Sequence, residues 1–296
     1  MKSSNPKREK KRWLKRGAWV LIFILLLGAS SFYLLPPAGY IPVLMYHFVV
    51  PSDRVGSTSL DVSVEDFQKQ MWFLKTFGFR PISLDELYAI KSGEHKPKGR
   101  EVVITFDDGN ETFIQFALPV LEKYQIPVAN FLVWNFLGNR AHGSMGLEDA
   151  KRLVKHPLVT LGSHTLSHPI LIDVSPAKAR KEIMESKRRL EQALGRKIDY
   201  FSYPSGFLSP DVMEFVREAG YRLAFTTAKK RLGGRPETPL SLYRIKIAPR
   251  QSLLIFWGTV AGILHYGKEL DVFYQKLTER MMSGKLTPYK LRPQAT

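Results

Sequence analysis

The chain has 296 residues, of which 44% are hydrophobic and 12% aromatic, and its formal net charge is +17. This composition excludes an intrinsically disordered protein, and the length suits one large domain or two small ones. No cysteine is present. Disulfide bonds and thiolate metal sites are therefore excluded, and any metal must be held by His, Asp or Glu.

The positive charge is densest at the N-terminus. Residues 1–16 hold eight Lys or Arg and one Glu, a net charge of +7, which leaves +10 for the rest of the chain. Such a surplus favours anionic surroundings, such as a cell envelope or a membrane surface. Nucleic acid is the competing partner, but no RNA-binding aromatic signature, zinc-finger spacing or basic zipper pattern supports it. We therefore expect no nucleic-acid partner.

An apolar run without any charge follows the basic tail, over residues 17–35. Its length is close to the roughly 20 residues that cross a bilayer, and the positive flank predicts that the tail (1–16) is cytoplasmic and the body extracytoplasmic. A cleavable signal peptide is the alternative, because Gly28-Ala29-Ser30-Ser31 offers small residues near the end of the run. The continuing apolar residues up to Leu35 favour an uncleaved, single-pass anchor in the cell membrane. Residues 36–40 then form a short Pro-rich linker.

Beyond the linker, residues 41–47 predict a short buried strand that ends in His47. Ser63 with Asp66, and Ser83 with Glu86, form capping patterns that predict two helices. The polar residues 91–100 indicate a loop, and the β-branched run at 102–104 indicates a buried strand leading to Asp107.

Strands and helices then alternate. We predict helices at 112–124, 147–155, 175–194 and 210–219, and strands at 129–134, 159–162, 200–203, 223–226 and 242–247. This alternation implies a parallel sheet and an α/β fold. About seven strands favour an incomplete (β/α) barrel over an open doubly wound sheet, and no dinucleotide fingerprint or P-loop follows any strand. We expect the barrel domain over residues 41–250 and a helical extension and tail over 251–296.

Five polar residues directly follow predicted strands: His47, Asp107, Asp108, His164 and Ser205. In a (β/α) barrel the carboxyl ends of the strands carry the active residues. These five side chains should therefore gather at one face of the barrel.

The paired carboxylates Asp107 and Asp108 repel each other and call for a cation, although Asp and Gly are also ordinary turn formers. His164 and His168, four residues apart, can face one point. Two His and one Asp leave positions open on a divalent metal, for which zinc is the best fit without excluding other ions. One Asp would hold the metal and the other would accept a proton from metal-activated water, which attacks a carbonyl. A leaving amine would need a further histidine as its acid.

These residues resemble a known family. Thr105–Gly109 together with Ser163–His168 is similar to the first two motifs of the polysaccharide deacetylases, the NodB-homology or carbohydrate esterase family 4 enzymes. Phe201–Gly206 resembles their third motif, and Pro42–His47 resembles the opening of the branch that deacetylates poly-N-acetylglucosamine. The resemblance extends from about residue 41 to residue 247.

The resemblance implies a role for each matched residue. Asp107 would be the catalytic base, and the metal ligands would be Asp108, His164 and His168. Ser205 would offer its backbone N–H to the oxyanion. His47 is the expected general acid, and His265 is the alternative, because many members place this histidine in a late Leu-containing motif.

Two departures from the family pattern stand out. The arginine that usually precedes the third motif is absent, since Tyr200, Phe201 and Ser202 occupy that stretch, so the orienting role of that arginine is unfilled. The usual fourth motif is not found. Tyr203 in the third motif and Trp134 at a strand end are the expected substrate contacts.

The helix at 175–194 carries many charges of both signs, Glu182 and Glu185 among them. We interpret this charged face as solvated.

The expected function is that of a membrane-anchored, metal-dependent hydrolase that removes N-acetyl groups from an envelope or extracellular amino-sugar polysaccharide. The alternatives are a deacetylase of peptidoglycan, an O-acetyl esterase using the same site, or a non-catalytic polysaccharide-binding module.

Overall fold

The computed structural model describes residues 39–139, 143–227 and 237–263. The predicted membrane anchor at 17–35 and the alternative acid His265 lie outside these residues. Within the described ranges, no helix has both the length and the apolar character needed to cross a membrane.

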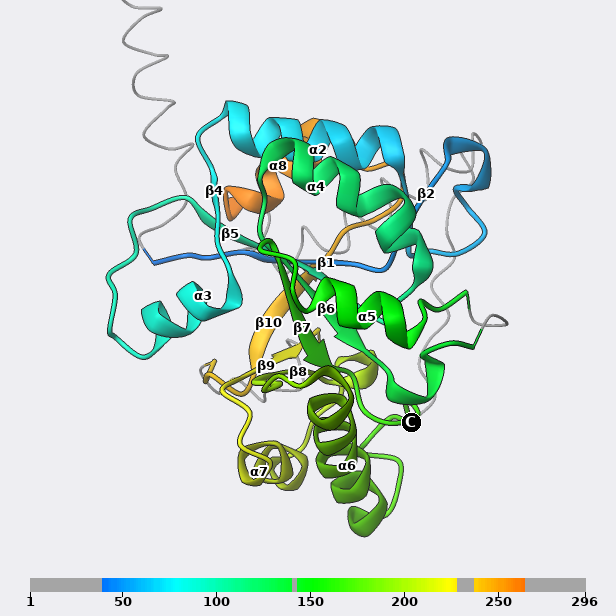
Figure 1. The fold of residues 1–296 in the computed structure, drawn as a ribbon. Helices are drawn as coiled ribbons and strands as arrows, with labels where there is room; N and C mark the ends of the chain where they lie inside the picture. The colour runs from blue at the N-terminus through cyan, green and yellow to red at the C-terminus, as the bar shows by residue number, and fades with distance from the viewer. Residues whose placement is uncertain (1–38, 140–142, 228–236, 264–296) are drawn as a thin grey trace, which may run out of the picture.

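Seven parallel strands form the centre of the molecule, with helices packed around them (Figure 1). β1 pairs with both β5 and β10 and so closes the row that runs from β5 to β10 into a barrel. The strands of the ring are β1 (Val43–Tyr46), β5 (Glu101–Phe106), β6 (Val128–Leu132), β7 (Val159–Ser163), β8 (Tyr200–Ser202), β9 (Leu223–Thr226) and β10 (Leu242–Lys246). The predicted parallel (β/α) barrel of about seven strands is confirmed, and its ring closes with seven strands.

Three shorter strands were not predicted. β2 (Phe48–Val50) and β3 (Asp61–Ser63) pair with each other in a separate small sheet, and the short 3-10 helix η1 (Ser52–Arg54) lies between them. β4 (Arg80–Pro81) pairs with the first residues of β5. These strands have two or three residues each, which is too few to show an alternating pattern, and they lie outside the strand–helix alternation that located the equally short β8.

The helices begin where the capping residues predict. Ser63 and Ser83 accept hydrogen bonds from the backbone N–H of Asp66 and Glu86, and each bond satisfies an N–H that the first helical turn leaves without a partner. The helices are α2 (Val64–Thr76), α3 (Leu84–Lys91), α4 (Leu118–Tyr124), α5 (Leu147–Leu153), α6 (Pro176–Leu194), α7 (Pro210–Glu218) and α8 (Leu253–Val260).

The helix predicted over 112–124 is not uniform. Phe113–Ala117 form a π-helical turn, and the α-helix α4 begins only at Leu118. Pro119 lacks the N–H that an unbroken α-helix would use at this point, and the wider turn directly precedes it.

Alternate strand residues supply two apolar layers, as the period of two in a strand requires. One layer fills the barrel. Leu84 and Leu87 of α3 belong to this layer, so α3 closes the end of the barrel where the strands begin. The strand residues of the layer include Val103, Ala129, Phe131, Phe225 and Leu242. The other layer packs the outside of the barrel against the helices and includes Leu44, Ile104, Leu132 and Leu161. At the opposite end of the barrel, where the strands end, polar residues take the place of the apolar layer that fills the barrel.

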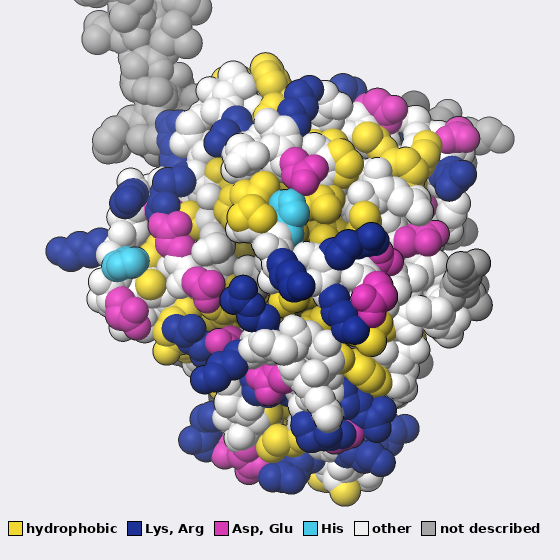
Figure 2. All heavy atoms as spheres, in the orientation of Figure 1, with side chains coloured by type: hydrophobic (Ala, Val, Ile, Leu, Met, Phe, Trp, Pro, Cys, Tyr) yellow, Lys and Arg dark blue, Asp and Glu magenta, His cyan; other side chains and the backbone are white. Residues whose placement is uncertain are grey.

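Lys and Arg side chains are interspersed with Asp and Glu over the lower part of the face in Figure 2, where α6 and α7 lie. Arg188 and Arg189 of α6 pair with Glu185 at 2.5 and 2.8 Å; Arg188 is exposed and Arg189 is half-buried. For this part of α6 the predicted solvated face is confirmed.

Candidate active site at the carboxyl end of the barrel

The predicted polar residues converge where the strands end. His47 follows β1, Asp107 and Asp108 follow β5, and His164 follows β7. The backbone there adopts several conformations with positive φ, which non-glycine residues rarely take: Asp108 (71°), Thr165 (72°), His168 (60°) and Ser205 (55°). Such costly conformations cluster at functional sites.

Three side chains form a group suited to a metal ion: Asp108, His164 and His168. Asp108 Oδ1 lies 3.8 Å from His164 Nε2 and 3.7 Å from His168 Nε2, and the three ligand atoms all lie within 4.8 Å of one another. Asp108 Oδ1 is buried yet has no hydrogen-bond partner. A buried carboxylate oxygen without a partner is costly, and a cation among these three atoms would remove that cost. The donor set therefore fits a divalent metal.

The ring of His164 is held in the form that a metal needs. Its Nδ1 lies 2.7 Å from the carbonyl oxygen of Ser202. Because a carbonyl can only accept, Nδ1 carries the proton and Nε2 keeps a free lone pair toward Asp108. Burial lowers the pKa of His164 to about 3, so the imidazole is neutral at physiological pH. Burial also raises the pKa of Asp108 to about 6, and the charge of Asp107 adds to this effect.

Asp107 is held by an arginine that the sequence analysis did not identify. Arg244 of β10 donates from Nη1 to Oδ1 at 2.7 Å and from Nη2 to Oδ2 at 2.6 Å, and Nη2 also donates to Ser202 Oγ at 2.7 Å. Arg244 and Asp107 are only 1% and 2% exposed. Burial alone would raise the pKa of Asp107, but the charge of Arg244 outweighs it and holds this pKa well below its usual range.

Arg244 therefore corrects the expectation that the base has no orienting arginine. The arginine is absent from the third motif but comes from a strand about forty residues later in the chain, and β1 separates β10 from β5 in the ring. The sequence contains one signal that could have revealed it. Arg244 is a charged residue at an inward position of a predicted strand, and a buried arginine requires a buried carboxylate.

His47 lies across Asp107 from the histidine pair. Its Nε2 is 3.9 Å from Asp107 Oδ2, and its side chain is 13% exposed. Burial lowers the pKa of His47, although the charges of Asp107 and Asp108 oppose this effect. His47 is outside the metal-suited group, which is the location that a general acid requires.

Glu182 of α6 corrects the sequence-based interpretation of a solvated charged face. It is 6% exposed, and its carboxylate accepts hydrogen bonds from the backbone N–H of Leu166 and Ser167 at 3.0 and 2.9 Å and from Ser167 Oγ at 2.7 Å. The bonded residues form the loop between His164 and His168. Glu182 therefore fixes the loop that presents both imidazoles.

Ser205 lies in the short 3-10 turn η5 (Pro204–Gly206) after β8, with its backbone at positive φ. Gly206 is required beside it, because a Cβ there would lie 2.5 Å from the backbone nitrogen of Thr227. The geometry of this turn therefore depends on glycine.

The two predicted substrate contacts are less open to a ligand than expected. Tyr203 is fully buried, and its hydroxyl donates to the carbonyl oxygen of Leu240 at 2.9 Å; this corrects the prediction for its side chain. Trp134 lies in the turn η3 (Trp134–Phe136) after β6, half-buried, with the Arg189 guanidinium 6.0 Å from its ring. Phe136, not predicted, stacks near His168 at a ring distance of 6.2 Å.

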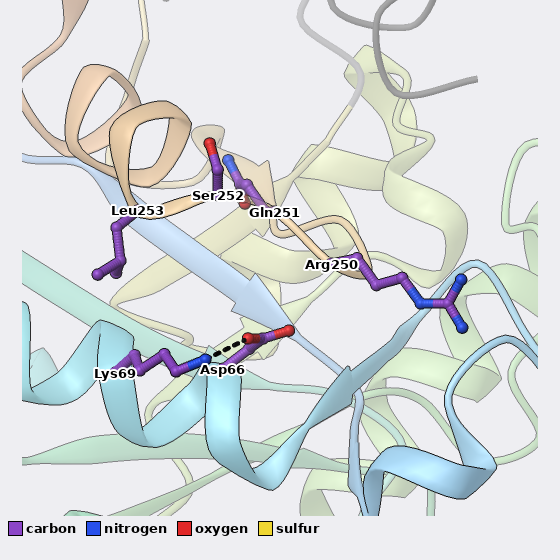
Figure 3. Close-up of a pocket in the computed structure, with 6 residues that line it drawn as sticks. All are labelled: Asp66, Lys69, Arg250, Gln251, Ser252 and Leu253. Carbon is purple, nitrogen blue, oxygen red and sulfur yellow. Dashed lines mark ion pairs between the residues drawn. The ribbon is translucent and has the colours of Figure 1, made fainter. Parts of the chain in front are cut away.

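A separate cavity of about 420 Å³ lies between the N-terminal half of α2 and the segment that leads into α8 (Figure 3). It is lined by Asp66, Lys69, Arg250, Gln251, Ser252 and Leu253. None of these is a predicted site residue, and Lys69 is paired with Asp66 at 3.6 Å. The candidate catalytic residues therefore lie at the barrel mouth and not in this cavity.

Comparison with known proteins gives a consistent result. Residues 94–224 match the family model for polysaccharide deacetylase, a segment that includes Asp107, Asp108, His164 and His168. The chain is 29% identical to the poly-β-1,6-N-acetyl-D-glucosamine N-deacetylase of Staphylococcus epidermidis, over 57% of this chain and 62% of that relative. More than a third of that relative is thus unmatched.

Among the solved structures that are similar to this one, two are informative. The Streptococcus pyogenes deacetylase PplD in complex with acetate has a TM-score of 0.66 and 28% identity, over 76% of this chain and 99% of PplD. IcaB from Ammonifex degensii has a TM-score of 0.64 and 29% identity, over 77% of this chain and 97% of IcaB.

Proposed function

We propose that this chain, whose residues 94–224 match the polysaccharide deacetylase family model, is a metal-dependent N-deacetylase of a poly-N-acetylglucosamine-like polymer. One observation carries the proposal. The group of Asp108, His164 and His168 shares the barrel mouth with Asp107, whose carboxylate Arg244 holds in place.

A divalent metal bound at the three ligands would lower the pKa of the attacking water and polarise the acetyl carbonyl. Two imidazole nitrogens and one carboxylate oxygen suit zinc, which we propose as the ion. His164 is oriented for this role by Ser202, and the loop of His168 is oriented by Glu182.

Asp107 is ionised and faces the metal group, since its Oδ2 lies 3.8 Å from His164 Nε2. We assign it as the base that takes a proton from water as the oxygen bonds to the acetyl carbon. His47, on the other side of Asp107, gives a proton to the nitrogen as the C–N bond breaks. The products are acetate and a free amine on the sugar.

The polymer is proposed from two lines of support. The S. epidermidis relative is by name a poly-β-1,6-N-acetyl-D-glucosamine N-deacetylase, and the opening residues Pro42–His47 resemble the same branch. The apolar run at 17–35 supports a location in the cell membrane with the barrel outside.

Acetate release from defined substrates tests the proposal. We expect release from β-1,6-linked N-acetylglucosamine oligomers, abolition by a chelator and restoration by zinc. Chitooligosaccharides, peptidoglycan fragments and O-acetylated sugars are the competing substrates.

The variant His164→Ala should be inactive, whereas His156→Ala should be active, because His156 pairs with Glu122 in a different part of the molecule. Release that neither the chelator nor His164→Ala affects would overturn the mechanism. Release from peptidoglycan alone would overturn the choice of polymer.

A further inference from the structure

Lys246 occupies a position at the barrel mouth that the mechanism above does not use. It follows Arg244 by two residues on β10, so both side chains lie on the same, inward face of the strand. β10 runs beside β1, with Lys246 in register with Met45, two residues before His47. Lys246 is therefore one layer above Arg244, at the opening of the barrel and on the side of His47.

Lys246 has no carboxylate partner among the described residues. The polar contact recorded for its Nζ is the hydroxyl of Ser59, at 3.1 Å, in the loop between β2 and β3. Part of the Lys246 side chain is covered by protein, and this partial burial lowers its pKa. The other inward cation of β10, Arg244, is paired with Asp107. Lys246 is thus an uncompensated cation that remains exposed at the mouth.

The charge of the mouth matters for this class of substrate. The reaction converts a neutral acetamido group into an amine that is protonated at neutral pH. A polymer chain therefore gains one positive charge at each deacetylated sugar. With a divalent cation at the three ligands, the charges of the ion and Arg244 are balanced by the carboxylates of Asp107, Asp108 and Glu182. Lys246 then adds one positive charge that none of these acids offsets, on the side of His47.

We propose that Lys246 is a specificity-determining residue that disfavours an already deacetylated sugar beside the sugar that reacts. This inference rests on the proposed function. Two unit charges about 8 Å apart in a partly exposed site repel each other enough to change relative rates by about fivefold. The enzyme would then act preferentially on neutral, acetylated stretches and space its products apart along the polymer.

The experiment compares two substrates of equal length: a fully acetylated β-1,6-linked oligomer and the same oligomer with one glucosamine next to the reacting sugar. The measured quantity is the ratio of their kcat/KM values. We expect the wild type to favour the acetylated oligomer about fivefold. The ratio should fall in Lys246→Gln and remain high in Lys246→Arg, which keeps the positive charge.

Two controls separate charge from structure. Ser59→Ala removes the contact of Lys246 with the loop but keeps the charge, so the ratio should not change. Raising the ionic strength should reduce the ratio in the wild type, because salt screens exposed charges; this measurement does not depend on any variant folding.

The outcomes distinguish the two proposals. A wild type that releases no acetate from either oligomer refutes the proposed function. An active wild type whose ratio is insensitive to both salt and Lys246→Gln refutes the role of Lys246 alone, and so does a ratio that Ser59→Ala changes as strongly as Lys246→Gln.

Discussion

Arg244 and Asp107 form a buried, bidentate ion pair. Removing one partner of such a pair destabilises a protein much more than replacing both partners with apolar residues. Removing one partner leaves the other charge buried without compensation, which destabilises a protein by about 3–5 kcal/mol. The geometry is also specific to arginine, because a lysine ammonium cannot donate to both carboxylate oxygens in the same planar arrangement.

We therefore predict that Arg244→Met lowers acetate release at least about 100-fold and lowers the free energy of unfolding by about 3–5 kcal/mol. Arg244→Lys should recover part of the stability but little of the activity. Denaturant unfolding and acetate release measure the two effects. In the double variant Asp107→Asn with Arg244→Met, stability should return without activity; a double variant no more stable than Arg244→Met would contradict the pair as described.

We predict that substitutions of the adjacent residues Asp107 and Asp108 have different effects on zinc binding and on acetate release. Asp107→Asn should keep bound zinc and lose acetate release by about 10²–10⁴-fold, since it removes the base and not a ligand. Asp108→Asn should lose zinc on dialysis. Metal content by mass spectrometry and acetate release on the same samples distinguish the two roles. Equal loss of zinc in both variants would show that Asp107 is also a ligand.

At the level of elements, α6 shows how a helix positions a site without entering it. One face carries Arg188, Arg189 and Glu185 in ion pairs at the protein surface, and surface ion pairs contribute little to stability. The other face sends Glu182 beneath the loop of the two histidines.

We predict that Glu182→Gln weakens zinc binding about tenfold or more, as the loss of a supporting hydrogen bond around a metal site typically does. The neutral amide of Gln accepts weaker hydrogen bonds from the backbone N–H groups of Leu166 and Ser167 than the Glu182 carboxylate does. The matched control is Glu185→Gln on the same helix, which should leave zinc affinity unchanged. Competition with a chromophoric chelator measures the affinity. Equal affinities in the two variants would mean that the loop does not depend on Glu182.

The elements themselves were largely predictable because their signals are local. Ser63 and Ser83 identify two helix starts, and the β-branched run before Asp107 identifies a strand. The site ligands were predictable for the same reason, since His164 and His168 lie in one short motif. Glu182 and Arg244 were not interpreted correctly, because their partners are 15 and 137 residues away and only the fold brings them together.

At the scale of the whole molecule, one end of the barrel carries the candidate active site and the other end is closed by apolar packing. The mouth carries the histidines, the carboxylates and the positive-φ residues Asp108, Thr165, His168 and Ser205. The other end is closed by α3, whose Leu84 and Leu87 pack with the apolar side chains inside the barrel. A six-residue strand such as β5 spans roughly 20 Å, so a defect at the closed end does not touch the ligands.

We therefore predict that Leu87→Ala lowers the free energy of unfolding by about 2–5 kcal/mol, because it leaves a cavity at a fully buried position. The melting temperature should fall by about 4–20 °C, while acetate release at 25 °C stays near the wild-type value. His168→Ala is the converse variant: its side chain is 29% exposed, so activity should be lost with little change in melting temperature. Calorimetry and acetate release on both variants test this separation. If folded Leu87→Ala lost activity in step with its stability, the packing inside the barrel would be setting the geometry of the mouth, and the two ends would act as one unit.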